Sequence, residues 1–206
     1  MDIVCTTSKP AGHVLVVHSW WGLTPSFHDY AERLAEHGFA VGLTDLFDGR
    51  TADDIAQAQQ LRRAPRRVPM YRTLIADIDH LRAAGGQTAP SVAVIGFSMG
   101  GHWAVWLSQR RDLPIRATVL YYAARAGSFA SSQASFLAHF AKDDPWVRPP
   151  TRRRMEKAIA AAGRPYQAFD YPGTRHWFAE AGRQDAYHPD AAALALDRTI
   201  AHLKTA

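Results

Sequence analysis

The chain has 206 residues, of which 47% are hydrophobic and 21% are charged, and it can bury a substantial core. It lacks an apolar run long enough to span a bilayer and an export signal, so we expect a cytoplasmic protein without a membrane anchor. The single cysteine, Cys5, excludes an internal disulfide. The net charge of +5 comes mostly from scattered arginine clusters without a nucleic-acid-binding motif, which we interpret as solvated surface.

Strands and helices alternate from the start of the chain. An edge strand is expected at 3–6, and buried strands at 13–18 and 39–44. The helix between the buried strands begins with Thr24 as N-cap and Pro25 at its first position, and ends near Gly38. Two helices follow, over 51–63 and about 69–84, separated by prolines at 65 and 69 and ended by glycines at 85 and 86.

The second half continues the alternation. We expect strands at 91–95, 115–122, 135–141 and 166–171, and helices after residue 98, at 150–162 and at 189–203. Because each parallel connection needs a crossover, this order predicts an α/β fold. Its mostly parallel sheet has about seven strands with helices on both faces, in one domain over residues 1–206. The loops at the carboxyl ends of such strands meet at one edge, where ligands bind.

One of these loops carries a glycine-flanked serine. The sequence GFSMG at 96–100 follows a run rich in β-branched residues and precedes a helix, as in a G-x-S-x-G nucleophile elbow. Such a turn forces Ser98 into a strained conformation and presents its hydroxyl above the end of the strand. The first N–H groups of the following helix point toward Ser98, where they can stabilise an oxyanion.

A serine nucleophile needs a base and an acid that orients the base. Two later post-strand loops supply them in the order expected for this fold, first an aspartate and then His176. Asp144 is preferred as the acid, with Asp143 as the alternative. Two other histidines near the predicted site, His18 and His102, are interpreted as residues that line or buttress it.

Aromatic residues also gather in the strand-end loops and indicate an apolar pocket for a small substrate. They are Trp20, Trp21, Phe47, Tyr122, Trp146 and Trp177. Some of them could instead cap the core at the edge of the sheet. No histidine–carboxylate cluster at ligand spacing is visible, so neither a metal nor another cofactor is expected.

Five segments then define a family resemblance. They are SWWGL at 19–23, DLFDGRTA at 45–52, GFSMGG at 96–101, DPWV at 144–147 and YPGTRHWF at 171–178. In these segments, and over nearly its full length, the chain resembles the dienelactone hydrolase family of α/β-hydrolases. The resemblance implies an α/β-hydrolase fold without a separate lid and a triad of Ser98, Asp144 and His176. It also implies an oxyanion hole made by the N–H groups of Trp20 and Met99.

Three positions depart from the best-known members of that family. Those members have a cysteine nucleophile where this chain has Ser98, and a glutamate in the first loop where it has Ser19, which we also assign to the pocket. These two changes are consistent with each other, because the glutamate of those members partners the cysteine thiol, which a serine lacks. The third change puts Glu180 in place of an arginine that holds the substrate carboxylate. An acidic side chain near the pocket would repel such a substrate, unless Arg125 or Arg175 compensates.

The sequence therefore predicts a serine hydrolase that cleaves a small carboxylic ester or lactone through an acyl-serine intermediate. The alternative is a non-catalytic α/β-hydrolase-fold protein that binds a ligand or a partner protein. We expect a small-molecule substrate, no nucleic acid or membrane partner, and a monomer or homodimer.

Overall fold

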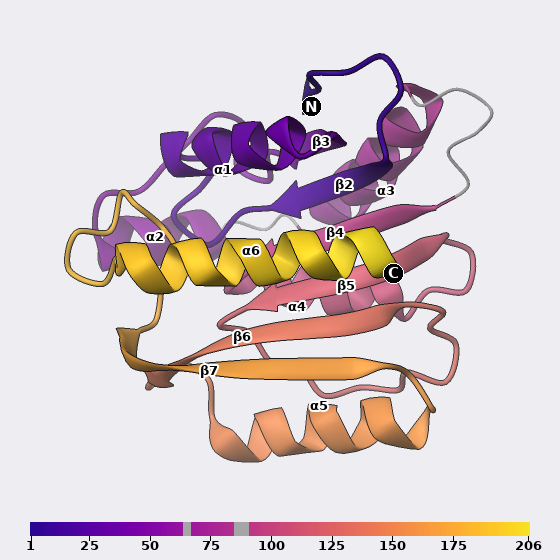
Figure 1. Cartoon of the computed structure of the whole chain (residues 1–206). Helices are drawn as coiled ribbons and strands as arrows, with labels where there is room; N and C mark the ends of the chain where they lie inside the picture. The colour runs from indigo at the N-terminus through magenta and orange to yellow at the C-terminus, as the bar shows by residue number, and fades with distance from the viewer. Residues whose placement is uncertain (64–66, 85–90) are drawn as a thin grey trace.

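The computed structural model describes residues 1–63, 67–84 and 91–206, and these build one sheet of seven strands (Figure 1). The strands are β1 (Asp2–Val4), β2 (Gly12–Val17), β3 (Phe39–Thr44), β4 (Val92–Phe97), β5 (Ile115–Tyr121), β6 (Ser135–Asp143) and β7 (Tyr166–Arg175). Their order is β1-β3-β2-β4-β5-β6-β7, and only the β1–β3 pair is antiparallel. The predicted mostly parallel sheet is confirmed.

The central strands are covered on both faces by helices. All residues of β3 and β4 are buried, which explains why both read as continuous apolar runs rather than as alternating patterns. One face packs against α1 (Pro25–Glu36) and α6 (Pro189–Thr205), which lie in front of the sheet in Figure 1. The other face packs against α3 (Arg67–Ala84), α4 (Met99–Ser108) and α5 (Pro149–Ala161). The remaining helix is α2 (Ile55–Arg63).

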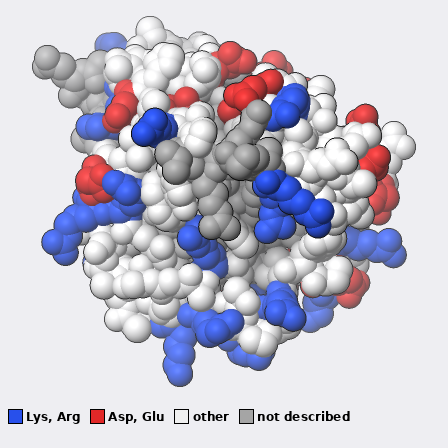
Figure 2. All heavy atoms as spheres, turned by 180° about the vertical axis from the view of Figure 1, so that it is seen from behind, with Lys and Arg blue, Asp and Glu red and all other residues white. Residues whose placement is uncertain are grey.

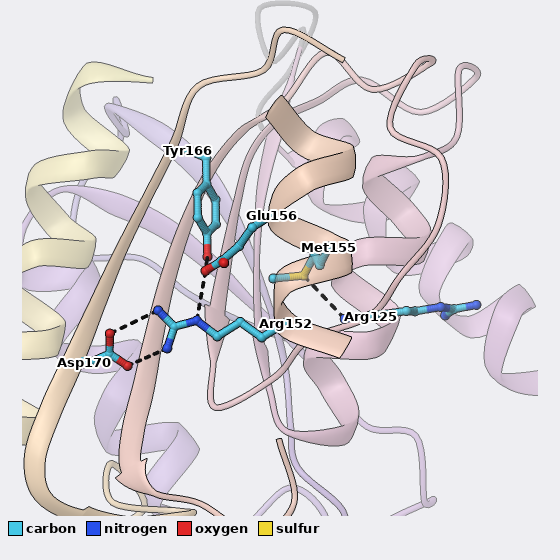
Figure 3. A network of polar contacts seen from close by, with 6 residues as sticks. All are labelled: Arg125, Arg152, Met155, Glu156, Tyr166 and Asp170. Carbon is cyan, nitrogen blue, oxygen red and sulfur yellow. Dashed lines mark hydrogen bonds and ion pairs between the residues drawn. The ribbon is translucent and has the colours of Figure 1, made fainter. Parts of the chain in front are cut away.

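Polar contacts join α5 to the last strand (Figure 3). The Arg152 guanidinium donates to both carboxylate oxygens of Asp170 on β7, and its Nε donates to Glu156 Oε1 over 2.9 Å. The Tyr166 hydroxyl donates to the same oxygen of Glu156 over 3.0 Å. This network lies on one side of α5, while Met155 and Ile159 are buried toward the core.

Several element boundaries differ from the sequence prediction. The first strand is shorter and lies at Asp2–Val4, while α2 begins only at Ile55. Strands β6 and β7 run longer because, beyond a register shift after Ala141, pairing resumes between Asp143 and Arg175. The helix break predicted at Pro65 and the helix end predicted at 85 and 86 lie outside the described residues. None of the described helices is long and apolar enough to cross a membrane.

Candidate active site

The serine of the G-x-S-x-G motif lies in the turn between β4 and α4. Ser98 has φ +51° and ψ −108°, a conformation that L residues rarely adopt. The flanking glycines permit the turn because the backbone passes too close for side chains. A Cβ on Gly100 would lie 2.1 Å from the Val17 carbonyl oxygen, and one on Gly96 would lie 2.3 Å from the Gly100 carbonyl oxygen. The strained serine turn expected from the sequence is therefore present.

Ser98, His176 and Asp144 form a continuous hydrogen-bonded chain. Ser98 Oγ lies 2.8 Å from His176 Nε2, and His176 Nδ1 lies 2.7 Å from Asp144 Oδ2. The other carboxylate oxygen, Asp144 Oδ1, accepts the backbone N–H groups of Trp146 and Val147. These N–H groups fix the carboxylate, which keeps the imidazole proton on Nδ1 and leaves Nε2 free to accept from the serine.

The structure distinguishes between the two candidate aspartates. The Asp144 and His176 side chains are each only 5% exposed. Asp143, by contrast, is an exposed residue at the end of β6, paired in the sheet with Arg175. Asp144 is thus the aspartate that is placed to orient His176.

The two other histidines near the site have different surroundings. His18 is fully buried, with Nδ1 2.5 Å from the Ser19 carbonyl oxygen, while Nε2 accepts the Leu46 N–H over 3.0 Å. Burial lowers the pKa of His18 to about 4, although the Ser19 carbonyl and Asp45 act in the opposite direction. It is thus a neutral buttress beneath the first strand-end loop, while His102 lines the cavity beside Ser98.

The two N–H groups predicted to form an oxyanion hole belong to residues near the serine. Met99 is the first residue of α4, and Trp20 lies in the loop after β2. Within the described parts of the chain, neither N–H donates a hydrogen bond. Both residues line the same cavity as Ser98.

A cavity of about 300 Å³ opens above the serine. Trp20 forms its aromatic wall, with its ring stacked on Trp177 at 5.7 Å between centroids and edge-on to Trp146 at 5.0 Å. Tyr122 also lines it, 4.9 Å from the His176 ring. Four of the aromatic residues predicted for the pocket are thus present in its wall.

A family model of the dienelactone hydrolase family matches residues 2–206. The chain belongs to the dienelactone hydrolase family. Membership makes it a hydrolase of the ester and lactone type.

Curated relatives and solved structures resemble this dienelactone hydrolase family member over most of its length. Carboxymethylenebutenolidase of Rhodococcus opacus is 26% identical, covering 87% of the chain and 75% of the relative. A putative carboxymethylenebutenolidase of Aquifex aeolicus is 25% identical, covering 97% and 90%. The dienelactone hydrolase-like promiscuous phosphotriesterase P91, from metagenomic libraries, shares the fold with a TM-score of 0.84 at 23% identity, covering 97% and 87%.

Three residues predicted for the pocket do not line it, which corrects the sequence-based expectation. Ser19, Trp21 and Phe47 are at most 1% exposed and lie beneath the loops. Trp21 packs edge-on against Trp177, and the Phe47 ring lies 5.0 Å from the buried His18 ring. Their large apolar side chains, and the hydroxyl that Ser19 turns inward, complete the core at this edge of the sheet.

Glu180 is also buried, contrary to the expectation that it would face a substrate. Its carboxylate is 2% exposed and accepts hydrogen bonds from Ser19 Oγ and the Tyr122 hydroxyl. Burial raises the pKa of Glu180 to about 7, opposed by those two hydrogen bonds and by Arg183. Glu180 does not line the cavity, and neither do Arg125 and Arg175, the arginines considered as compensating charges.

The cavity instead has a basic side that the sequence did not reveal. Arg62 at the end of α2 and Arg148 just before α5 both line it, and no carboxylate is among its described lining residues. Neither guanidinium has a hydrogen-bond or ion-pair partner among the described residues. Figure 2 shows the face covered by α3, α4 and α5, where basic side chains predominate away from the upper rim. Arg148 follows Trp146 closely in sequence, which was a usable signal. Arg62 had none, because its cluster resembled a solvated helix face.

Among the described residues, no three or more His, Cys, Asp or Glu side chains are grouped so that they could hold a metal ion.

Proposed function

We propose that this family member is a serine hydrolase that cleaves a small carboxylic ester or lactone through an acyl-serine intermediate. One observation supports the proposal above all others, namely the aligned chain from Ser98 through His176 to Asp144, with contacts of 2.8 and 2.7 Å. This is the arrangement that activates a serine hydroxyl at neutral pH. A non-catalytic binding protein does not require it, and the alternative function has no comparable support.

The proposed reaction uses the donors and acceptors of this site in turn. Ser98 Oγ attacks the substrate carbonyl carbon while its proton passes to His176 Nε2. Asp144 stabilises the resulting imidazolium, and the N–H groups of Trp20 and Met99 bind the carbonyl oxygen as it becomes negative. His176 then protonates the leaving alcohol oxygen as the ester bond breaks. Water attacks the acyl-serine with His176 as base, which releases the carboxylic acid and restores the Ser98 hydroxyl.

The cavity favours a small substrate that carries negative charge. Its volume of about 300 Å³ is at the small end of ligand pockets, and its aromatic wall suits an apolar acyl or ring portion. Arg62 and Arg148 supply the only formal charges among its described lining residues, apart from histidine protonation. The carboxymethylenebutenolidase relatives are named for a carboxylate-bearing butenolide, a lactone whose charge fits these arginines.

An active-site label tests the proposal directly. A fluorophosphonate phosphonylates only an activated serine, so peptide mass mapping should find the label on Ser98 in the wild type and in Ser128→Ala. That control removes an exposed serine from another loop. Ser98→Ala should stay unlabelled, and His176→Ala should react far more slowly. A wild-type chain that stays unlabelled where a control esterase reacts contradicts the proposal.

A further inference from the structure

We propose that Glu180 is a positioning residue of the active site. Its buried carboxylate joins the loops after β2, β5 and β7, and thereby holds the Trp20 N–H and the His176 imidazole in register with Ser98. The inference rests on the proposed function, since it assigns Glu180 a part in that chemistry without contact with the substrate.

The contacts of the carboxylate span three separate segments of the chain. Oε2 accepts from Ser19 Oγ over 2.7 Å, and Oε1 accepts from the Tyr122 hydroxyl over 2.8 Å. Ser19 follows β2 and Tyr122 follows β5, while Glu180 itself lies in the loop after β7. All three side chains are at most 2% exposed, so water does not compete for these hydrogen bonds. One side chain therefore ties together three loops that border the site.

The first contact acts on the oxyanion-binding N–H. Ser19 and Trp20 share one peptide group, whose planarity makes the Trp20 N–H point opposite to the Ser19 carbonyl. That carbonyl accepts the Gly22 N–H over 3.3 Å and lies against His18 Nδ1. Ser19 Oγ receives the Trp21 N–H over 3.3 Å while it donates to Glu180. Because Ser19 is held at both its carbonyl and its hydroxyl, the Trp20 N–H has a fixed direction.

The second contact acts on the histidine. Tyr122 has φ +40°, a backbone conformation that a non-glycine residue keeps only when its surroundings hold it there. Its ring packs against His176 at 4.9 Å and against Phe178 at 5.5 Å. The hydrogen bond to Glu180 anchors the far end of this ring, so the ring supports the imidazole from one side.

The third link runs through the chain itself. Glu180 lies four residues after His176, and its own N–H donates to the Trp177 carbonyl over 3.0 Å. A displacement of the Glu180 carboxylate therefore moves the histidine loop as well. Displacements of about 1 Å at such supports can cost about 100-fold in rate, because the reacting groups lose their alignment.

Steady-state kinetics with a p-nitrophenyl ester test the assignment in Glu180→Ala, Glu180→Gln and Ser19→Ala. Glu180→Ala should lower kcat at least about 10-fold with KM nearly unchanged. The reason is that the oxyanion-binding N–H of Trp20 and the base His176 both act in the transition state. Glu180→Gln should recover most of the loss, since its amide can bond the same two hydroxyls. The matched control is Glu156→Ala, which also removes a carboxylate that accepts a tyrosine hydroxyl but lies outside the cavity (Figure 3). It should leave kcat within about twofold of the wild type.

Hydrogen exchange provides a readout that does not depend on catalysis. In Glu180→Ala the hydrogen-bonded amides of Trp21, Gly22 and Tyr122 should exchange faster than in the wild type and in Glu156→Ala. Unchanged exchange and kcat in Glu180→Ala overturn the assignment, as does an equal loss of kcat in Glu156→Ala. If Glu180→Ala does not fold, an unchanged kcat in Ser19→Ala overturns it instead. A wild type that neither labels nor hydrolyses esters refutes the proposed function, while the exchange data still decide whether Glu180 holds the loops.

Discussion

Replacing Glu180 with glutamine should change how the stability of the fold depends on pH. Burial raises the pKa of this carboxyl from 4.5 to about 7, so between these values the folded chain binds a proton that the unfolded chain has lost. Stability therefore falls as pH rises through this window. Among the described residues that act on this carboxylate, Arg183 is a positive charge that opposes the shift. Burial raises the pKa of the Tyr122 hydroxyl well above its usual range, so the tyrosine does not ionise in this window.

The size of the effect follows from the two pKa values. Ionisation of Glu180 should lower the free energy of unfolding of the wild type by about 2.5 kcal/mol between pH 5 and pH 8. Glutamine does not ionise, so Glu180→Gln should gain that amount relative to the wild type over the same range. For a chain of this size the gain corresponds to a relative rise in Tm of roughly 5–10 °C.

Urea unfolding followed by tryptophan fluorescence at both pH values measures the difference. All other titrating groups are shared by the two proteins and cancel, and Glu156→Gln shows what the same replacement does at a site outside this cluster. The reasoning is refuted if the free-energy difference between Glu180→Gln and the wild type is the same at pH 5 and pH 8.

Three further outcomes follow from the geometry of the site. Asp144→Asn should lower kcat by about 10³- to 10⁴-fold because the histidine loses its orienting acid, while Asp143→Asn should stay near the wild type. Steady-state ester hydrolysis measures both variants, and equal losses of kcat would contradict the choice of Asp144. Gly100→Ala should prevent folding or cost more than about 4 kcal/mol, since its Cβ would overlap the Val17 carbonyl; circular dichroism melting checks this, and an unchanged Tm would refute it. Arg148→Ala should raise KM by about 10-fold for a hemisuccinate ester but hardly for the matched neutral ester; equal effects on both would argue against an anion-binding role.

The sequence predicted the scaffold well because the relevant signals are local. Apolar runs and turn residues located the central strands, and the alternation with helices required a parallel sheet. The G-x-S-x-G turn was also predictable from its own residues, because a side chain at either glycine would clash with backbone atoms. The choice between Asp143 and Asp144 was harder, because neighbouring residues differ only in which one turns toward the histidine loop.

The pocket wall was less predictable because it depends on how loops close over one another. A tryptophan after a strand can line the cavity, as Trp20 does, or complete the core, as Trp21 does. The position of Glu180 in the sequence suggested a side chain that faces the substrate. Its carboxylate is instead buried, where it accepts hydrogen bonds from the hydroxyls of Ser19 and Tyr122. Arg62 lies at the end of α2, well separated in sequence from the end of β3, so no sequence pattern indicated that it lines the cavity.

The strand order also bears on how the chain regains activity after denaturation. The contact between Ser98 and His176 joins residues 78 positions apart, and that between Ser19 and Glu180 joins residues 161 apart. Contacts of such long range form only after the chain has closed its large loops, so they are late and slow to appear. A fragment that begins after Ser19 or ends before Glu180 cannot assemble both contacts. Recovery of ester hydrolysis during refolding thus reports that the loops after β4 and β7 have come together, and not the formation of either half alone.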